Sequence, residues 1–250
     1  MTDEVRQVYR DRLPSTQELA LSWAREGVGV GSYVAAGEQT AGRGQAGRAW
    51  HSPYGGLYLS AVLPAPEARL GWLSLSAGLA LRDLLLSEGT SSLWVKWPND
   101  LVVAPTPRSP GPRKLAGVLV DVLSIPSGPS RAVVGVGLNV RRPVSRPPPG
   151  LQERMAFLAE GNGAAMEPRE LIPKVLSALR AACEGLQDPG TLDNIPDRLA
   201  GALWGVGCRI DAPEGPGTFL GVDASGAARI QLAKGETRSV LPGSLTWEVP

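Results

Sequence analysis

The sequence predicts a mixed α+β protein that ends in a small all-β segment. Helical periodicity and apolar β-type runs alternate over the first two hundred residues, and from residue 204 the pattern changes to short strands between glycine-rich turns. A composition of 43% hydrophobic and 20% charged residues is typical of a globular protein. With 250 residues, we expect a larger domain over 1–202 and a small one over 203–250.

The first helix is expected to begin at Ser15, which caps it, while Glu18 reaches back in a capping box and Gly27 ends the helix. Leu19, Ala20, Trp23 and Ala24 are expected on its buried face. Strands over 31–36 and 57–63 then flank a glycine-rich loop over 37–47.

An amphipathic helix over 70–85 is predicted by leucines at spacings of three and four. The remaining strands of the larger domain are expected at 93–97, 115–123 and 132–140, and its helices at 151–160, 169–186 and 192–200. Proline-rich stretches at 104–112 and 141–150 are typical of mobile loops. The expected strands of the small module, which resembles a β-barrel, are 205–211, 217–222, 227–233, 237–241 and 245–249.

Charge and composition exclude several function classes. A balance of 25 Lys and Arg against 24 Asp and Glu argues against nucleic acid as the main partner. Two cysteines and a single histidine, His51, exclude a zinc finger and a serine–histidine–aspartate triad, and we expect His51 at the surface. The apolar stretch 79–86 is too short to span a membrane, and with no export signal we expect a cytoplasmic protein.

The segment 42–47 matches the glycine fingerprint GxGxxG of dinucleotide-binding proteins. That motif needs a helix to begin inside it, and the following residues 48–56 cannot form one, so we expect no dinucleotide site. Arg43 and Arg48 beside these glycines are suited to binding an anion, with a solvated surface turn as the alternative.

A second cluster, Lys96, Asn99 and Asp100, lies around a Trp-Pro turn at a strand end. A lysine, an amide and a carboxylate together suit phosphates with Mg²⁺, and ordinary turn chemistry is the alternative.

Two strands carry further candidates. Lys114 opens an apolar strand, where it is either partly buried for function or an edge-strand lysine that opposes aggregation. Gly135 and Gly137 in a buried strand indicate close approach of a ligand or another backbone, and Asn139 follows them as a polar group.

In this order, the motifs Ser15-Thr16, 38–50, 96–100, 113–117 and 135–139 resemble those of the biotin–protein ligases, and the resemblance extends over essentially the whole chain. It implies a mixed-sheet catalytic domain of the class II synthetase-like or lipoate ligase-like type with flanking helices, followed by an SH3-like β-barrel. It also implies that ATP, with Mg²⁺, converts biotin to biotinyl-adenylate. Biotin then passes to a lysine of a biotin carboxyl carrier protein. Homodimers are common in this family.

The resemblance also implies residue roles. The implied biotin-binding residues are Ser15, Thr16, Gln39, Gly42, Arg43, Trp50, Lys114 and Gly117. The implied ATP-binding residues are Arg48, Lys96, Asn99, Lys114 and Asn139, with Lys114, Arg48 and Asp100 as the catalytic group and Asp100 as the Mg²⁺ ligand. The stretch 141–150 is a candidate lid, with a plain linker as the alternative.

This sequence departs from the family at Gln45, where many members carry an arginine that helps to retain the adenylate. Only 14 residues precede Ser15, so we expect no N-terminal DNA-binding domain of the kind that biotin-sensing repressors carry. The alternatives left open are a lipoate or octanoate transferase, a non-catalytic protein that binds biotin or its carrier, and a transcriptional regulator.

Overall fold

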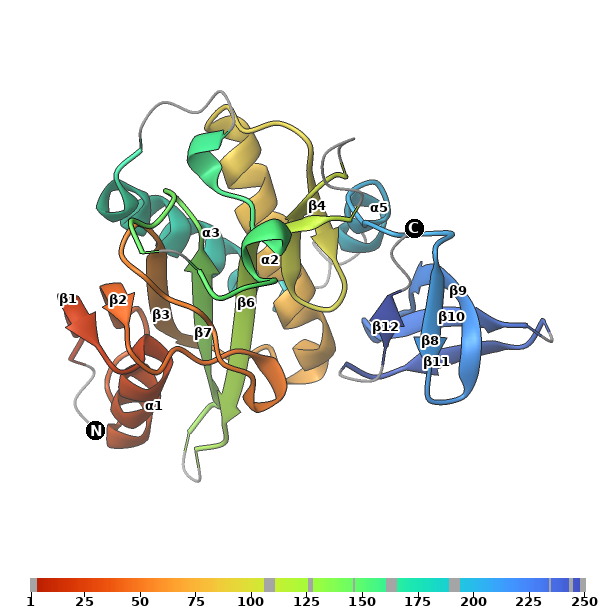
Figure 1. Ribbon diagram of the computed structural model, residues 1–250. Helices are drawn as coiled ribbons and strands as arrows, with labels where there is room; N and C mark the ends of the chain where they lie inside the picture. Colours follow the sequence, from red (N-terminus) through yellow and green to blue (C-terminus); the bar gives the residue numbers. More distant parts are fainter. Residues whose placement is uncertain are drawn as a thin grey trace.

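The computed structural model describes residues 4–105, 111–125, 128–145, 147–160, 166–188, 194–233, 235–242 and 245–247. It contains a seven-stranded mixed sheet with strand order β1-β2-β3-β7-β6-β5-β4 and a five-stranded sheet with order β11-β10-β9-β8-β12. Figure 1 shows the second sheet beside the first, at the C-terminal end of the chain. The predicted mixed sheet with flanking helices and a small all-β segment is confirmed.

The large sheet is antiparallel apart from the parallel pair formed by β1 and β2. Its central strands β6 and β7 pair over eight residues, and β3 and β7 pair over eight more. The strands are β1 (Gln7–Leu13), β2 (Tyr33–Gln39), β3 (Leu57–Pro64), β4 (Leu93–Lys96), β5 (Asp100–Val103), β6 (Arg113–Leu123) and β7 (Arg131–Leu138).

Helices cover both faces of this sheet because its strands are apolar on both sides. On one face, α1 (Thr16–Glu26) packs Ala20, Leu21 and Ala24 against residues of β2, β3 and β7. On the other face, α2 (Leu70–Ser87) and α3 (Ile172–Gly185) form the main core with the odd-numbered residues of β3. A short helix, α5 (Ile195–Ala200), contacts α2 before the chain enters the second sheet.

The segment Glu67–Ser87, which contains α2, is long and apolar enough to cross a membrane by length and composition alone. Half of its most apolar 18-residue stretch is buried inside the protein, where Leu73, Ala77 and Leu81 pack in the main core. Its apolar character is therefore that of a core helix.

Three features differ from the prediction. Strands β1 and β5 were not predicted: β1 is a largely exposed edge strand without apolar alternation, and β5 follows the Trp-Pro turn directly. The predicted helix over 151–160 is wrong, because only two short 3₁₀ turns form there, Gln152–Arg154 and Leu158–Glu160. Leu21, which was not predicted, is buried on α1, whereas Leu19 and Trp23 are partly buried and pack against the same core.

The reason for the missing helix is that the backbone of this segment bonds to the sheet. Ala156 N–H donates to the carbonyl of Lys114 at 2.9 Å, and Leu158 N–H donates to the carbonyl of Asn139 at 2.9 Å. These bonds hold the segment beside β6 and β7 in place of intrahelical bonds. Within the two proline-rich stretches, residues 106–110 and 146 lie outside the described residues.

The second sheet is joined to the first by hydrogen bonds as well as by the chain. Its strands are β8 (Arg209–Ala212), β9 (Gly215–Val222), β10 (Ala228–Leu232), β11 (Thr237–Val240) and β12 (Thr246–Trp247). The indole N–H groups of Trp72 and Trp97 donate to the carbonyls of Ala224 at 2.8 Å and Gly226 at 3.1 Å. Phe219 and Ile230 of the second sheet belong to the same apolar core as α2 and α3.

Candidate active site

The site lies on the face of the large sheet that α1 partly covers, over a floor of glycines in β6 and β7. Gly117 pairs with Gly137 across these strands, and Leu119 pairs with Gly135. A Cβ atom at Gly135 would lie 2.4 Å from Gln17 Oε1, and one at Gly137 would lie 2.5 Å from the indole of Trp50. The close approach predicted at these glycines is therefore made by two side chains of this chain.

Trp50 comes from the glycine-rich loop between β2 and β3, which folds across the floor. Gly42 allows this fold, since a Cβ there would lie 2.4 Å from Ser52 Oγ and 2.5 Å from the carbonyl oxygen of Trp50. The loop forms only a three-residue 3₁₀ turn, Gln45–Gly47. A long helix at the glycine fingerprint is therefore absent here, as the sequence predicted.

Trp50 and Lys114 separate two cavities that share one wall. The smaller cavity, of about 160 Å³, reaches down to the glycine floor and to Thr16 and Gln17 of α1. The larger cleft, of about 700 Å³, extends past Lys96 and Asn139 to Arg154. The residues that line both are Gln39, Arg48, Ala49, Trp50, Asp100 and Lys114.

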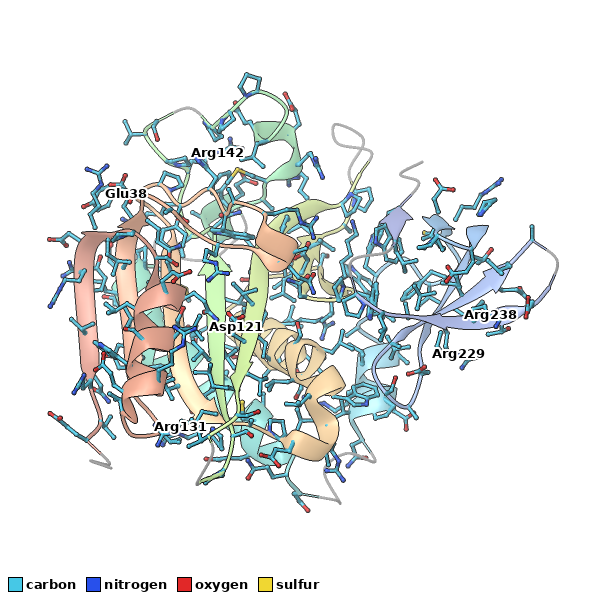
Figure 2. The ribbon with its side chains drawn as sticks, turned by 90° about the horizontal axis from the view of Figure 1, so that it is seen from below. Glu38, Asp121, Arg131, Arg142, Arg229 and Arg238 are labelled. Carbon is cyan, nitrogen blue, oxygen red and sulfur yellow. The ribbon has the colours of Figure 1, made fainter. Side chains whose placement is uncertain are left out.

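A chain of hydrogen bonds forms the polar end of the smaller cavity. Gln17 Nε2 donates to Asp121 Oδ2 at 2.8 Å and to the carbonyl of Val133 at 3.0 Å. Asp121, labelled in Figure 2, projects from β6 on the face that α1 covers. Because both amide hydrogens of Gln17 are used, its Oε1 accepts from Ser60 Oγ at 2.9 Å.

This chain fixes the direction of the remaining bonds. Ser60 has donated its only hydrogen, so the hydroxyl of Thr16 is the donor toward the two acceptors beside it, Ser60 Oγ at 2.9 Å and Gln39 Oε1 at 3.0 Å. Gln39 Oε1 accepts the backbone N–H of Thr16 at 2.8 Å, and Gln39 Nε2 donates to Ser52 Oγ at 2.9 Å. Gln39 Oε1 has both the backbone N–H and the hydroxyl of Thr16 within hydrogen-bond distance, whereas Thr16 Oγ1 keeps its lone pairs, so this end of the cavity offers an acceptor to a ligand that donates an N–H group.

The shared wall and the larger cleft are lined by cations. Lys114 Nζ lies 2.6 Å from Asp100 Oδ1 and 4.6 Å from the centroid of the Trp50 ring. Burial lowers the pKa of Lys96, an effect that the nearby charges of Lys114 and Arg154 increase and that Asp100 opposes. An anion with several charges, such as a polyphosphate, fits this surface.

Lys96 and Asp100 face each other across the hairpin of β4 and β5, as expected for the turn at a strand end. Lys114 lies on β6, which is paired on both sides by β5 and β7, so the alternative of an edge-strand lysine is wrong. Asn139 Nδ2 donates to the carbonyl of Lys114 at 3.1 Å, and Asn99 Nδ2 donates to the carbonyl of Val118 at 2.7 Å. Both amides therefore brace β6.

Other predicted residues lie at the margin of the site. Ser15 is buried and caps α1 by accepting from the backbone N–H of Glu18, and it lines neither cavity. Gly42 lines only the larger cleft. Arg43 pairs with Glu18, so the carboxylate expected to complete a capping box instead holds an arginine at the rim of the smaller cavity.

Sequence reasoning missed several polar residues of the site, which are Gln17, Thr40, Ser52, Ser60, Asp121 and Arg154. Gln17 could have been found because it follows Ser15-Thr16 on the same helix turn; Ser60, Asp121 and Arg154 have no local signal. His51, expected at the surface, is half-buried and lines the larger cleft. Asp100 is the only carboxylate that lines either cavity among the described residues, which contain no group of three metal-ligating side chains.

The mixed sheet carries a small cavity with a hydrogen-bond acceptor at one end, beside a cleft lined by cations. This arrangement is typical of enzymes that activate an organic acid with a nucleotide. Residues 9–139 match the biotin/lipoate A/B protein ligase family, and the chain belongs to this family. The biotin–[acetyl-CoA-carboxylase] ligase of Paracoccus denitrificans is 30% identical over 93% of this chain and 96% of its own length.

Two further comparisons extend over most of the chain. The bifunctional ligase/repressor BirA of Bacillus spizizenii is 27% identical over 91% of this chain and 70% of its own length. The solved structure of the biotin protein ligase from Aquifex aeolicus, in complex with biotin and ATP, superposes with a TM-score of 0.78 at 27% identity, covering 98% of this chain and 99% of that one.

Proposed function

We propose that this chain is a biotin–[acetyl-CoA-carboxylase] ligase. It activates biotin with ATP and transfers the biotinyl group to a lysine of a biotin carboxyl carrier protein. The observation that carries the proposal is the wall shared by the two cavities, where Lys114 stands between a site for an uncharged polar ring and a site for a polyphosphate. The Paracoccus and Aquifex relatives support the same activity.

The smaller cavity favours biotin over lipoate, the other acid in the name of this family. The ureido ring of biotin carries two N–H donors and one carbonyl acceptor, whereas the dithiolane ring of lipoate has no donor. Thr16 Oγ1 donates its hydrogen within the protein and offers its lone pairs to a ureido N–H group, and the second hydrogen of Gln39 Nε2 is a donor for the ureido carbonyl. The dithiolane ring of lipoate would make neither of these hydrogen bonds, so the cavity binds it less well than the ureido ring.

The first reaction joins two anions. An oxygen of the biotin carboxylate attacks the α-phosphorus of ATP, and the bond from that phosphorus to pyrophosphate breaks. Lys114 is placed to hold the carboxylate and the α-phosphate together, as a compact charge at the boundary of the two cavities. Releasing Lys114 from Asp100 is part of substrate binding, since the two now form an ion pair.

The other roles follow from position. Arg48 and Lys96 bind the phosphates, Asn139 and Asn99 hold β6 in place, and Asn139 also faces the nucleotide in the larger cleft. Trp50 and the backbone of Gly117 enclose the apolar chain of biotin, while Gly42 shapes the loop that carries Trp50 and Arg43 closes the rim. Ser15 orients Thr16 through the helix cap.

The donor set fits a magnesium ion that arrives with the nucleotide. Mg²⁺ needs only one or two protein carboxylates when phosphates complete its shell, and Asp100 supplies one. When bound there, the ion neutralises phosphate charge.

In the second reaction the lysine ε-amine of the carrier attacks the acyl carbon of biotinyl-adenylate, and AMP leaves. We assign the residues that contact biotin and ATP to the domain 1–202, with 203–250 as a second, smaller domain. We place the reaction in the cytoplasm, since it consumes ATP and both Cys183 and Cys208 are free thiols. We further propose that the chain binds no nucleic acid, that it forms a homodimer as many family members do, and that the segment 141–150 is a lid.

Pyrophosphate release from ATP tests this function, with biotin or lipoate as the acid and with wild type and Lys114→Ala as the enzymes. We expect release with biotin only, lost in Lys114→Ala. Release with lipoate would contradict the proposal. Biotin binding by calorimetry without any turnover would also contradict it, and would make the chain a binding protein.

A further inference from the structure

Two tryptophans of the C-terminal module lie against Lys96, at the edge of the larger cleft. The Lys96 ammonium is 5.3 Å from the ring centroid of Trp204 and 5.3 Å from that of Trp247. The two rings are 5.2 Å apart and inclined at 58°, so they form a corner around the ammonium. Contacts of this length are within the range of cation–π attraction.

The corner is built into the structure. Phe219 packs edge-on against Trp247 at 4.9 Å, and the backbone of Trp204 pairs with β4 through a hydrogen bond of 2.8 Å from its N–H to the carbonyl of Val95. Gly205, at a φ of 85°, leaves room for the indole, since a Cβ there would lie 2.5 Å from the Trp247 ring. The neighbour of Lys96 in sequence, Trp97, is itself bonded to Gly226 of the module.

We propose that Trp204 and Trp247 are positioning residues for the adenylation reaction, which hold the Lys96 ammonium at the nucleotide cleft. This inference rests on the proposed function. A lysine side chain with four rotatable bonds loses entropy when it binds a phosphate, and a preformed aromatic corner removes part of that cost before ATP binds. Since Lys114 and Arg154 repel Lys96, the corner also opposes its displacement toward solvent.

The proposal gives the C-terminal module a specific task. The tryptophans contact Lys96, and the described residues that line the smaller cavity do not include Lys96, so the tryptophans should affect ATP and leave biotin unaffected. Lys96 lines only the larger cleft, consistent with this division.

The test is steady-state kinetics of pyrophosphate release on the full chain, varying ATP and biotin separately. We expect Trp247→Leu to raise the KM for ATP roughly three- to tenfold, from the strength of cation–π contacts, with the KM for biotin unchanged. Trp247→Phe keeps an aromatic face toward Lys96, so its KM for ATP should be close to that of the wild type. In a Lys96→Met background, Trp247→Leu should have no further effect.

Val240→Ala serves as the matched control, because it removes packing from the same module without touching Lys96. If Val240→Ala raises the KM for ATP as much as Trp247→Leu at equal melting temperature, the positioning role is wrong. The positioning role would also be wrong if Trp247→Leu raised the KM for ATP by the same factor in the wild type and in the Lys96→Met variant. Absence of turnover in wild type would instead refute the proposed function, so the two failures are distinguishable.

Discussion

The ammonium of Lys114 is held by Asp100 at 2.6 Å while the Trp50 ring lies 4.6 Å from it, so this cation, which with Arg48 lines both cavities, is already positioned at their boundary. Its position depends on a short loop and two strands. Asp100 begins β5 and Lys114 lies near the start of β6, while Trp50 comes from the glycine-rich loop. The ion pair with Asp100 keeps the Lys114 charge paired until the substrates bind, and substrate binding must then separate the two side chains.

Lys114→Ala should lower the rate of biotin-dependent pyrophosphate release by about 10² to 10³, as expected for removal of a group that stabilises transition-state charge. Lys114→Arg should recover little, because a planar guanidinium does not replace a compact ammonium between two anions. Lys174→Ala, which removes an exposed lysine paired with Glu88, is the control and should leave the rate unchanged. Single-turnover kinetics would measure this, and a full rate in Lys114→Ala would exclude the assigned role.

Much of the site could be predicted because its residues form local motifs. Lys96 and Asp100 are brought together by the hairpin of β4 and β5. Gly135 and Gly137 of β7 indicate a close contact because glycines are unusual inside a buried strand. Asp121 is different, since it contacts Gln17 from 104 positions away, and only the tertiary fold brings them together. No periodicity in the sequence contains that information.

The errors in the fold have a similar origin. The segment 151–160 has the composition of a helix, but its N–H groups bond to the carbonyls of Lys114 and Asn139. Strand β1 was missed because an exposed edge strand has no alternation of apolar and polar residues to detect. In both cases a tertiary partner decided the local structure.

Asp121→Asn should raise the KM for biotin about tenfold or more, since hydrogen bonds to a charged group are worth more than neutral ones. An asparagine can present its own N–H toward Gln17, which would turn the amide of Gln17 and reverse the bonds to Ser60 and Thr16. The KM for ATP should not change. Asp11→Asn, at an exposed carboxylate, is the control. Unaltered biotin affinity in a folded Asp121→Asn protein would show that the direction of these bonds does not matter.

Gln45→Arg should slow the release of biotinyl-adenylate. Gln45 lines the smaller cavity close to the shared wall, and a guanidinium there adds a cation beside the phosphate of the intermediate. The dissociation rate of preformed adenylate, chased with unlabelled biotin and ATP, should fall about tenfold, the effect of one charge-assisted hydrogen bond. Gln231→Arg, on β10 of the C-terminal module, is the control for added charge. An unchanged rate in Gln45→Arg would mean that this position does not reach the phosphate.

Gly137→Ala should disrupt the wall between the cavities. The new Cβ would lie 2.5 Å from the Trp50 ring, so the indole must leave the glycine floor. We expect the KM for biotin to rise about tenfold or more, because a displaced indole forfeits its packing on the sheet. Gly201→Ala, whose Cβ has its nearest neighbour at 3.8 Å, should behave as wild type. A crystal structure of Gly137→Ala with Trp50 unmoved would contradict the explanation.

Lys96→Met should weaken ATP binding without lowering the stability of the protein. Burial lowers the pKa of Lys96 below its ordinary 10.5, so between the folded and the ordinary pKa the unfolded chain binds more protons than the folded one. Stability from this group therefore rises with pH across that window, and at neutral pH the buried charge is a cost that methionine removes. The melting temperature of Lys96→Met at pH 7 should equal or exceed that of wild type while the KM for ATP increases. Calorimetry from pH 7 to 10 would show the difference between the two proteins shrinking as pH rises, and a constant difference would mean that Lys96 keeps an ordinary pKa.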